Sequence, residues 1–203
     1  MKTRTALVIA ALFVSAVALA ADAPQMTPEQ KAMMDKMMKA ATPGPQHAMF
    51  AKMAGEWNCT VKYQMDPSQP AQESQSTATI TTLMDGRYIQ EVDAGVMSGM
   101  PFSGMGIDGY DNVSGRYVST WIDNMGTGIE TSEGTADKTG KVITWTSTMN
   151  DPTTGKPAHS RMVTTIIDDN HHTFEMYSTP PGAKKEMKVM TIDYVRKDQS
   201  ATR

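Results

Sequence analysis

Seven side chains are the candidates for chemistry in this chain, because each puts a polar or aromatic group on a predicted strand. They are Trp121, Asp123, His159, Arg161, His172, Glu175 and Tyr177. Strand alternation places Trp121 and Asp123 on the face that also holds Tyr117, and His159 and Arg161 on the face that holds Val163. A guanidinium beside a carboxylate or phenol can bind a carboxylate or organise an acid–base pair. The sequence therefore predicts ligand contacts, with no residue named as catalytic.

A simpler interpretation competes for three of these residues. His159, Arg161 and Glu175 also fit cross-strand pairs on the surface, which contribute little to stability, and we favour that interpretation for them. His171 and His172 are adjacent in the sequence. On a strand they point to opposite faces, so they cannot both enter one pocket.

The sequence lacks the common motifs for zinc binding, for a serine nucleophile and for phosphate binding. There is no His-x-Glu-x-His, His-Glu-x-x-His or paired-cysteine spacing, which makes a dedicated zinc site unexpected. There is also no Gly-x-Ser-x-Gly elbow, and no glycine-rich phosphate loop before a helix. A hydrolase or isomerase of unrecognised type is kept as an alternative function. The lone Cys59 shares a predicted strand face with Trp57 and Val61, so we expect it to be buried and structural.

Methionine is the unusual feature of the composition. The chain has 19 methionines, and after residue 20 its only leucine is Leu83. One hypothesis treats the thioethers of residues 26–38 (MTPEQKAMMDKMM) as ligands for copper(I). The other treats methionine as a substitute for leucine, filling the core and one helix face. Methionines are also spread through the predicted strands, which favours substitution and leaves copper as the alternative.

The N-terminus predicts export. Lys2 and Arg4 precede an apolar run over residues 6–17, and Ala18-Leu19-Ala20 is a typical cleavage site, so we expect a signal peptide cut after Ala20 and a periplasmic or secreted protein. With the cleavage site included, the apolar stretch is about 15 residues long, shorter than the ~20 of a spanning helix, so no membrane anchor is expected. Cleavage leaves a net charge near −5, which gives no attraction for nucleic acid.

Two helices are predicted ahead of the strands. Thr27 and Gln30 form a capping box around Pro28, and residues 42–45 (TPGP) end that helix. A short helix over 46–54 follows, which in a small barrel often covers an open end. The expected organisation is a signal peptide (1–20), a methionine-rich helical extension with its linker (21–45), a β-barrel domain (46–197) and a tail (198–203).

Everything from Gly55 to Arg196 alternates in short segments separated by turn residues. The predicted strands are 56–65, 73–83, 87–93, 102–109, 116–123, 127–134, 141–149, 159–167, 172–178 and 185–196. Short connections favour an all-β fold, a single antiparallel ten-stranded up-and-down barrel with an N-terminal helical extension. We expect the glycine-rich stretch 95–106 to be a mobile loop at the rim, Asp108-Gly109 with Asp111-Asn112 and Gly115 to mark a corner, and Arg87 to support its turn.

Several motifs resemble one known family. Residues 53–57 (MAGEW), 85–90 (DGRYIQ), 109–123 (GYDNVSGRYVSTWID), 126–129 (GTGI), 132–135 (SEGT) and 172–177 (HTFEMY) occur in order. Over about residues 43–197 the chain resembles the secreted bacterial family catalogued as domain of unknown function 1579, with Asp85-Gly86-Arg87 where that family usually has Gly-Gly-Arg.

The resemblance implies a lipocalin-like or fatty-acid-binding-protein-like, calycin-type barrel, similar in outline to the haem-binding nitrobindins, and it implies no activity. We expect an exported protein that binds a small apolar or amphipathic molecule inside the barrel. A periplasmic copper or haem binder is the alternative, with His159 or His172 as the haem ligand. Cofactor, metal and oligomeric state are left open.

Overall fold

The structure is a computed structural model that describes residues 26–64 and 68–198. The predicted signal peptide and residues 199–203 of the predicted tail lie outside these residues. The elements, in chain order, are α1 (Pro28–Ala41), α2 (Pro45–Met53), β1 (Gly55–Tyr63), β2 (Gln72–Leu83), β3 (Tyr88–Met97), β4 (Met100–Asp111), β5 (Arg116–Asp123), β6 (Glu130–Ala136), β7 (Val142–Asn150), β8 (Pro157–Asp168), β9 (His171–Thr179) and β10 (Met187–Arg196). No helix in the described ranges is both long and apolar enough to cross a membrane.

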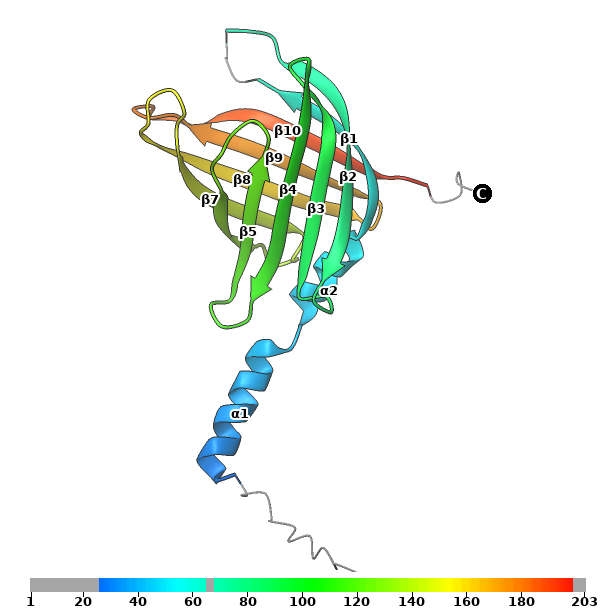
Figure 1. Cartoon of the computed structure of the whole chain (residues 1–203), viewed down its shortest axis with the longest axis vertical. Helices are drawn as coiled ribbons and strands as arrows, with labels where there is room; N and C mark the ends of the chain where they lie inside the picture. Colours follow the sequence, from blue (N-terminus) through cyan, green and yellow to red (C-terminus); the bar gives the residue numbers. More distant parts are fainter. Residues whose placement is uncertain (1–25, 65–67, 199–203) are drawn as a thin grey trace, which may run out of the picture. The chain divides into compact units, whose positions relative to one another are not determined.

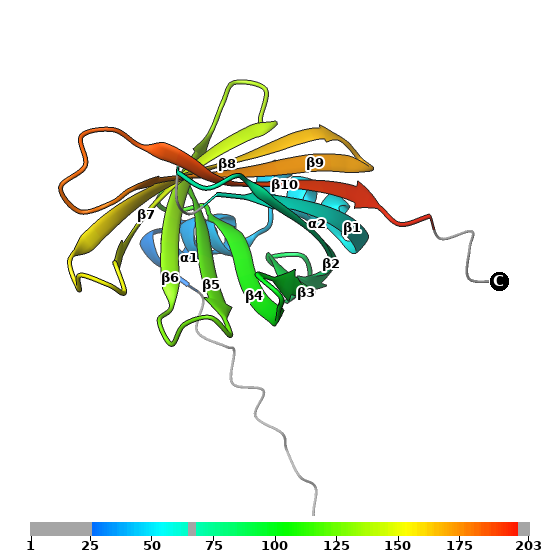
Figure 2. The same cartoon turned by 90° about the horizontal axis from the view of Figure 1, so that it is seen from above.

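The ten strands form one closed antiparallel barrel (Figures 1 and 2). Each strand pairs with its neighbours in sequence, and β1 pairs with β10 to close the ring. The predicted fold class is therefore confirmed. Closure leaves no strand edge unpaired, and it makes one face of every strand line a common interior. Bulges interrupt the register in β10, between Lys188 and Met190, and in β8, between Ile166 and Asp168.

The glycine-rich stretch was predicted wrongly as a loop. β3 and β4 run through it as regular strands and are joined by a tight turn at Ser98 and Gly99, both at positive φ. Asp108 and Gly109 also lie inside β4, and the expected corner falls at residues 112–115, where the Asp111 carboxylate accepts hydrogen bonds from the Val113 and Ser114 amides.

The glycines of β4 have a packing role that explains this difference. Gly104 and Gly106 lie beneath the indole ring of Trp121 on β5, and a Cβ at Gly104 would clash with that ring, while one at Gly106 would be 3.0 Å from it. Glycine is thus required by the close approach of a neighbouring aromatic ring.

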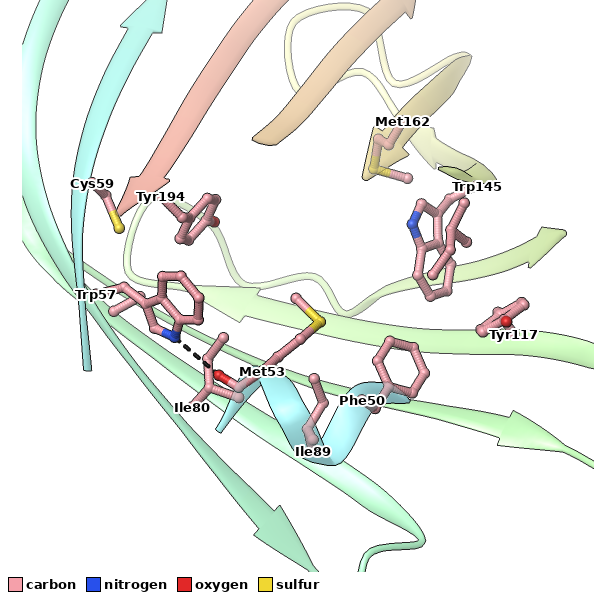
Figure 3. Packing of buried hydrophobic residues seen from close by; sticks show 12 residues of the cluster. Phe50, Met53, Trp57, Cys59, Ile80, Ile89, Tyr117, Trp145, Met162 and Tyr194 are labelled. Atoms are coloured by element: carbon pink, nitrogen blue, oxygen red, sulfur yellow. Dashed lines mark hydrogen bonds between the residues drawn. The ribbon is translucent and has the colours of Figure 1, made fainter. Parts of the chain in front are cut away.

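The filled hydrophobic core lies at the end of the barrel that α2 covers (Figure 3). Phe50 and Met53 of α2 pack among inward-facing strand residues, and the Trp57 Nε1 donates a 3.0 Å hydrogen bond to the Met53 carbonyl oxygen. The buried strand members of this cluster are Trp57, Cys59, Ala78, Ile80, Ile89, Tyr117, Ile143, Trp145, Met162 and Tyr194. Cys59 is 1% exposed, as expected. α2 therefore closes one end of the barrel.

Arg196 fixes α2 to the closing seam of the barrel. Its guanidinium donates to the carbonyl oxygens of Lys52 (2.8 Å), Ala54 (2.7 Å) and Asp169 (2.8 Å), and it lies 4.2 Å from the centre of the Trp57 ring. Gly55 has φ of 146°, and a Cβ there would clash with the Arg196 side chain. Glycine at the start of β1 is therefore needed both for its backbone and for this contact.

The methionine-rich helix contributes nothing to the core. The Thr27–Gln30 capping box forms as expected, with hydrogen bonds of 2.8 and 3.3 Å. No residue of α1 is buried, and its methionines Met33, Met34, Met37 and Met38 are exposed, as is Met26 ahead of it. The compact unit that contains the barrel begins at Met37, part-way along α1. The leucine-substitute interpretation therefore does not explain the methionines of this helix.

Candidate ligand-binding interior

In the half of the barrel away from α2, many inward-facing side chains remain partly accessible to solvent. Inward-facing Ser119 and Ser132, which pair across β5 and β6, keep part of their surface accessible, and so do Ser160 and Ser178 on β8 and β9. A filled protein interior leaves few voids. Small, accessible side chains on opposite walls therefore define an open interior.

Five carboxyl groups face the interior of the barrel, on four consecutive strands, and two of them, Glu91 and Asp108, pair directly with the core residues Ile80 and Ile89. The five are Glu91 and Asp93 on β3, Asp108 on β4, Asp123 on β5 and Glu130 on β6, all in register with inward-facing partners. Glu130 accepts a hydrogen bond from the buried Ser147 hydroxyl. Across the described residues, the inward-facing positions of β1–β9 carry no lysine or arginine. The interior is therefore strongly acidic.

Burial controls the ionisation of three of these acids. Desolvation raises the pKa of Asp93 to about 6 and that of Asp108 to about 6, although Asp108 is hydrogen-bonded to Ser119. Glu91 has its pKa raised well above its usual range by burial and by the charges of Asp93 and Asp108. Glu91 and Asp93 are hydrogen-bonded to each other, so their titrations are coupled.

One oxygen of each of the two deepest acids lacks a hydrogen-bond partner among the described residues. Asp93 is 6% exposed, and its Oδ1 has no hydrogen-bond partner within residues 26–64 and 68–198; the same holds for Glu91 Oε1. The Tyr194 hydroxyl is hydrogen-bonded to Glu91. Nearby, the pKa of the Cys59 thiol is raised to about 12 by burial and by the charges of Asp93 and Glu91. The thiol is therefore neutral at pH 7.

Trp121 lies flat on this acidic wall. Its ring covers Gly104 and Gly106, which are the direct neighbours of Asp93 and Glu91 on the other side. Trp121 Nε1 donates a 3.0 Å hydrogen bond to Asp123 Oδ2, and this bond fixes the ring. One face of the indole therefore rests on β4, and the other is turned to the interior, between two pairs of acids.

The seven predicted candidates separate into three places. Trp121 and Asp123 lie on the open interior wall, and His172 lies inside at the α2 end. The other four residues, His159, Arg161, Glu175 and Tyr177, lie on the outer face of β8 and β9, since they alternate with the inward-facing Ser160, Met162, Phe174 and Met176. A part in ligand binding for these four stays a prediction, and it concerns the outer surface.

The outer residues form a network of their own. Arg161 pairs with Glu186 at 2.6 Å and lies 3.9 Å from the centre of the Tyr177 ring. Glu175 accepts hydrogen bonds from Lys188 and Tyr177, and the pKa of Glu175 is lowered by Lys188. His159 and Arg161 also line a hollow of about 830 Å³ over the outside of β5–β8. His159 and Glu175 therefore pair across strands on the surface, with Thr148 and Lys188, whereas Arg161 pairs with Glu186, which precedes β10.

His172 belongs to the aromatic core rather than to an open site. Its ring stacks on Tyr194 at 4.2 Å and meets the edge of Trp57 at 4.4 Å, and its exposed fraction is 3%. Burial and the nearby Arg196 lower the pKa of His172 to about 4, so the imidazole is neutral. It borders a hollow of about 340 Å³ under α2, but its coverage by two aromatic rings leaves little access for a planar group such as haem.

The other haem candidate, His159, is exposed on the outer face, where its Nδ1 lies 2.9 Å from the Thr148 hydroxyl. Within the described residues, no three His, Cys, Asp or Glu side chains are grouped as a metal site would require. His171 points outward and pairs with Asp193, so the two adjacent histidines do face opposite ways. The structure thus brings none of the predicted histidines into the open interior.

Glu91, Asp93 and Asp108 were missed by sequence reasoning. In residues 88–93 the face with Tyr88 and Val92 is the more apolar, yet it is exposed, while the inward face carries the two acids. Asp108 precedes a glycine and therefore resembled a turn residue. The available signal was Ile89, which shares its face with Glu91 and Asp93.

The fold and the hollow, polar interior define a lipocalin-like antiparallel barrel. Residues 42–196 match the family described as Protein of unknown function (DUF1579), and the chain belongs to this family. The search of curated proteins finds no similar sequence.

Two solved structures share the fold. The crystal structure of Rv2717c from M. tuberculosis has a TM-score of 0.55 at 15% identity, over 77% of this chain and 100% of that one. The S-type phycobiliprotein lyase CPES from Guillardia theta has a TM-score of 0.56 at 10% identity, over 80% of this chain and 97% of that one. At these identities the likeness is one of fold alone.

Proposed function

We propose that the protein is exported and binds a small amphipathic molecule in the open half of its barrel. The observation that carries this proposal is the set of inward-facing serines and aromatic residues that remain accessible on β5–β9. A site of this kind, apolar walls with a few fixed polar groups, is typical of small-molecule binding. The hydrophobic core is consistent with this proposal, because it fills the end of the barrel that α2 covers. A ligand would then enter from the other end.

Native mass spectrometry of residues 21–203, purified from the export compartment, tests whether the interior holds a ligand. We expect a reproducible extra mass that leaves on unfolding. Sequencing of the same material is expected to begin at Ala21, and a chain that begins at Met1 would contradict export with cleavage.

Two variants test where the ligand lies. Ser132→Trp fills the interior, whereas Thr131→Trp places the same ring on the outer face of the same strand. Binding is followed with the neutral dye N-phenyl-1-naphthylamine, whose fluorescence rises in apolar sites. We expect Ser132→Trp to abolish the signal and Thr131→Trp to keep it. Loss in Thr131→Trp alone would place binding in the outer hollow and contradict the proposal.

A copper-binding function is a second candidate because all five methionines of residues 26–38 are exposed. Thioethers are soft ligands that suit copper(I). Copper(I) uptake that is lost when residues 21–42 are removed would support it. Uptake that persists without them would refute it.

A further inference from the structure

We infer that the polar part of the bound molecule is an organic cation, a protonated amine or a quaternary ammonium group, held against Trp121 by the carboxylates of β3–β6. This inference rests on the proposed function and makes its ligand class specific. Three independent features of the interior carry it: the sign of its charges, an unpaired buried oxygen and the placing of an indole face.

The sign of the charges selects the ligand. Five acids face the interior, and the inward-facing cation of the described barrel, Arg196, lies at the α2 end, where its guanidinium donates to three carbonyl oxygens. An anionic head group would enter a site of like charge, which costs several kcal/mol at close range. A cationic head group would be attracted instead.

Asp93 provides the buried contact. It is 94% buried, faces the interior, and has one oxygen without a hydrogen-bond partner among residues 26–64 and 68–198. A buried carboxylate oxygen without a partner is costly, and the cost is relieved when a cation or an N–H donor reaches it. Neighbouring Glu91 has an oxygen in the same condition, so the unsatisfied acceptors converge on one part of the wall.

Trp121 provides a surface for the organic part of the cation. Its ring rests on Gly104 and Gly106, between Glu91 and Asp93 on one side and Asp123 and Glu130 on the other. Cations bind over the face of an indole ring, and more strongly where water is excluded. A flat aromatic face between carboxylates is the arrangement that recognises alkylammonium groups.

The remaining wall suits an apolar tail. Phe102 on β4, Phe174 and Met176 on β9 and Met190 on β10 face inward and are partly accessible. Phe102 lies on the acidic wall itself, and the other three come from β9 and β10 on the opposite side of the ring. The ligand is therefore expected to combine one positive head group with an apolar body.

Three dodecyl amphiphiles that differ in head group test the inference: dodecyltrimethylammonium, dodecanoate and 1-dodecanol. Binding of each to residues 21–203 is measured by titration calorimetry at pH 8, below the concentration at which it aggregates. We expect dodecyltrimethylammonium to bind at least tenfold more tightly than dodecanoate, with dodecanol between them.

Matched charge variants locate the effect. Asp93→Asn with Asp108→Asn removes two charges from the interior, whereas Glu73→Gln with Glu133→Gln removes two from the outer face of β2 and β6 and changes the net charge equally. We expect the inner pair to weaken dodecyltrimethylammonium at least tenfold and the outer pair less than twofold. Circular dichroism checks that both variants fold. We expect the inner variant to fold, because an amide has the size of the buried carboxyl group and carries no charge to desolvate.

The possible outcomes separate the two proposals. Binding of dodecanoate as tight as that of the cation, or an inner variant with unchanged affinity, would overturn the cation inference and leave the proposed function standing. Absence of binding by all three amphiphiles, together with a ligand-free mass, would overturn the proposed function and this inference with it. Equal weakening by both variant pairs would show a general field effect and would also overturn the inference.

Discussion

At the scale of single residues, the acids of the interior make stability depend on pH. The folded state raises the pKa of Asp108 from 3.8 to about 6, so it binds a proton that the unfolded chain has already released. The stability from this protonated group is fully present below pH 3.8 and is lost as the pH rises through 6. The raised pKa of Asp93 also makes stability fall as the pH rises. Glu91 interacts electrostatically with both aspartates, and its own pKa is raised.

Asp108→Asn tests this dependence. The amide keeps the size of the side chain and a hydrogen bond to Ser119, but it cannot ionise. We expect the variant to match the wild type at pH 4 and to exceed it at pH 8 by about 1 to 3 kcal/mol in free energy of unfolding. Urea titrations at the two pH values measure the difference. A gain that is equal at both would show that ionisation is not its cause.

His172 affects how stability depends on pH below about pH 6.5. Its pKa is lowered to about 4 in the folded state, so its contribution is present above pH 6.5 and is lost as the pH falls towards 4. It opposes the acids between pH 4 and 6.5 and reduces the pH dependence of stability, but one histidine does not outweigh Asp93 and Asp108, so the contribution of these groups still falls as the pH rises. The Asp108 comparison is unaffected, since both proteins keep His172.

The Cys59 thiol should be inert. It is 1% exposed, and burial beside Asp93 raises its pKa to about 12, so no thiolate is present at neutral pH. We expect no reaction with 5,5′-dithiobis(2-nitrobenzoate) in the native protein at pH 8, and one thiol per chain in 6 M guanidinium chloride. Reaction at a rate independent of denaturant would contradict the burial of this strand face.

At the scale of elements, the glycines of β4 make room for the Trp121 ring of β5. Gly104→Ala introduces a methyl group into the Trp121 ring. We expect a loss of about 1 to 3 kcal/mol and a changed near-ultraviolet circular dichroism spectrum. Gly126→Ala is the matched control, because nothing lies within 4 Å of its Cβ position. In a Trp121→Leu background the cost of Gly104→Ala should largely disappear; an undiminished cost would show that the ring is not its source.

The elements also show where sequence reasoning succeeds and where it fails. Ten strands in meander order followed from turn chemistry at positions such as Asp85-Gly86 and Gly182, where the backbone adopts positive φ. The stretch 95–106 was predicted to be a loop because glycines in a sequence usually indicate flexible or turning backbone. Gly104 is instead needed because the Trp121 ring of the neighbouring strand packs against it. The inward face of β3 was equally hidden, since its apolar side is the exposed one.

The candidate site was only partly predictable for the same reason. Trp121 and Asp123 were found because a strand with Tyr117 had a clear inner face. Arg161 and Tyr177 share a face with equal clarity, but alternation alone does not say which face of β8 and β9 is inner. That choice is made by the register around the whole ring, in which Met162 lies between Trp145 and Met176.

At the scale of the whole molecule, the barrel should fold without the first helix turns. α1 has no buried residue, and the compact unit of the barrel begins at Met37. Residues 37–42 are retained because Asn112 and Arg87 donate hydrogen bonds to the carbonyl oxygens of Ala40, Ala41 and Thr42. A chain that begins at residue 37 is expected to keep its melting temperature within about 2 °C, roughly 1 kcal/mol for a domain of this size.

The truncated chain is compared with one that begins at residue 21, by calorimetry and by dye binding. A fall of more than about 5 °C would correspond to a loss of over 1 kcal/mol and would assign α1 a stabilising role. Preserved stability with lost dye binding would instead assign residues 21–36 to ligand capture.

The pairing of β1 with β10 has a consequence for how the chain is made. Nine of the ten strand pairings join neighbours in sequence and can form as the polypeptide emerges, but the last joins the two ends of the barrel domain. Until β10 is synthesised, the nascent sheet has two open edges, and Arg196 has not yet bound the carbonyl oxygens at the end of α2. The acidic interior is therefore enclosed only in the last step of folding. A chain that lacks β10 would keep two unpaired strand edges, which are prone to aggregation, and would enclose no binding site.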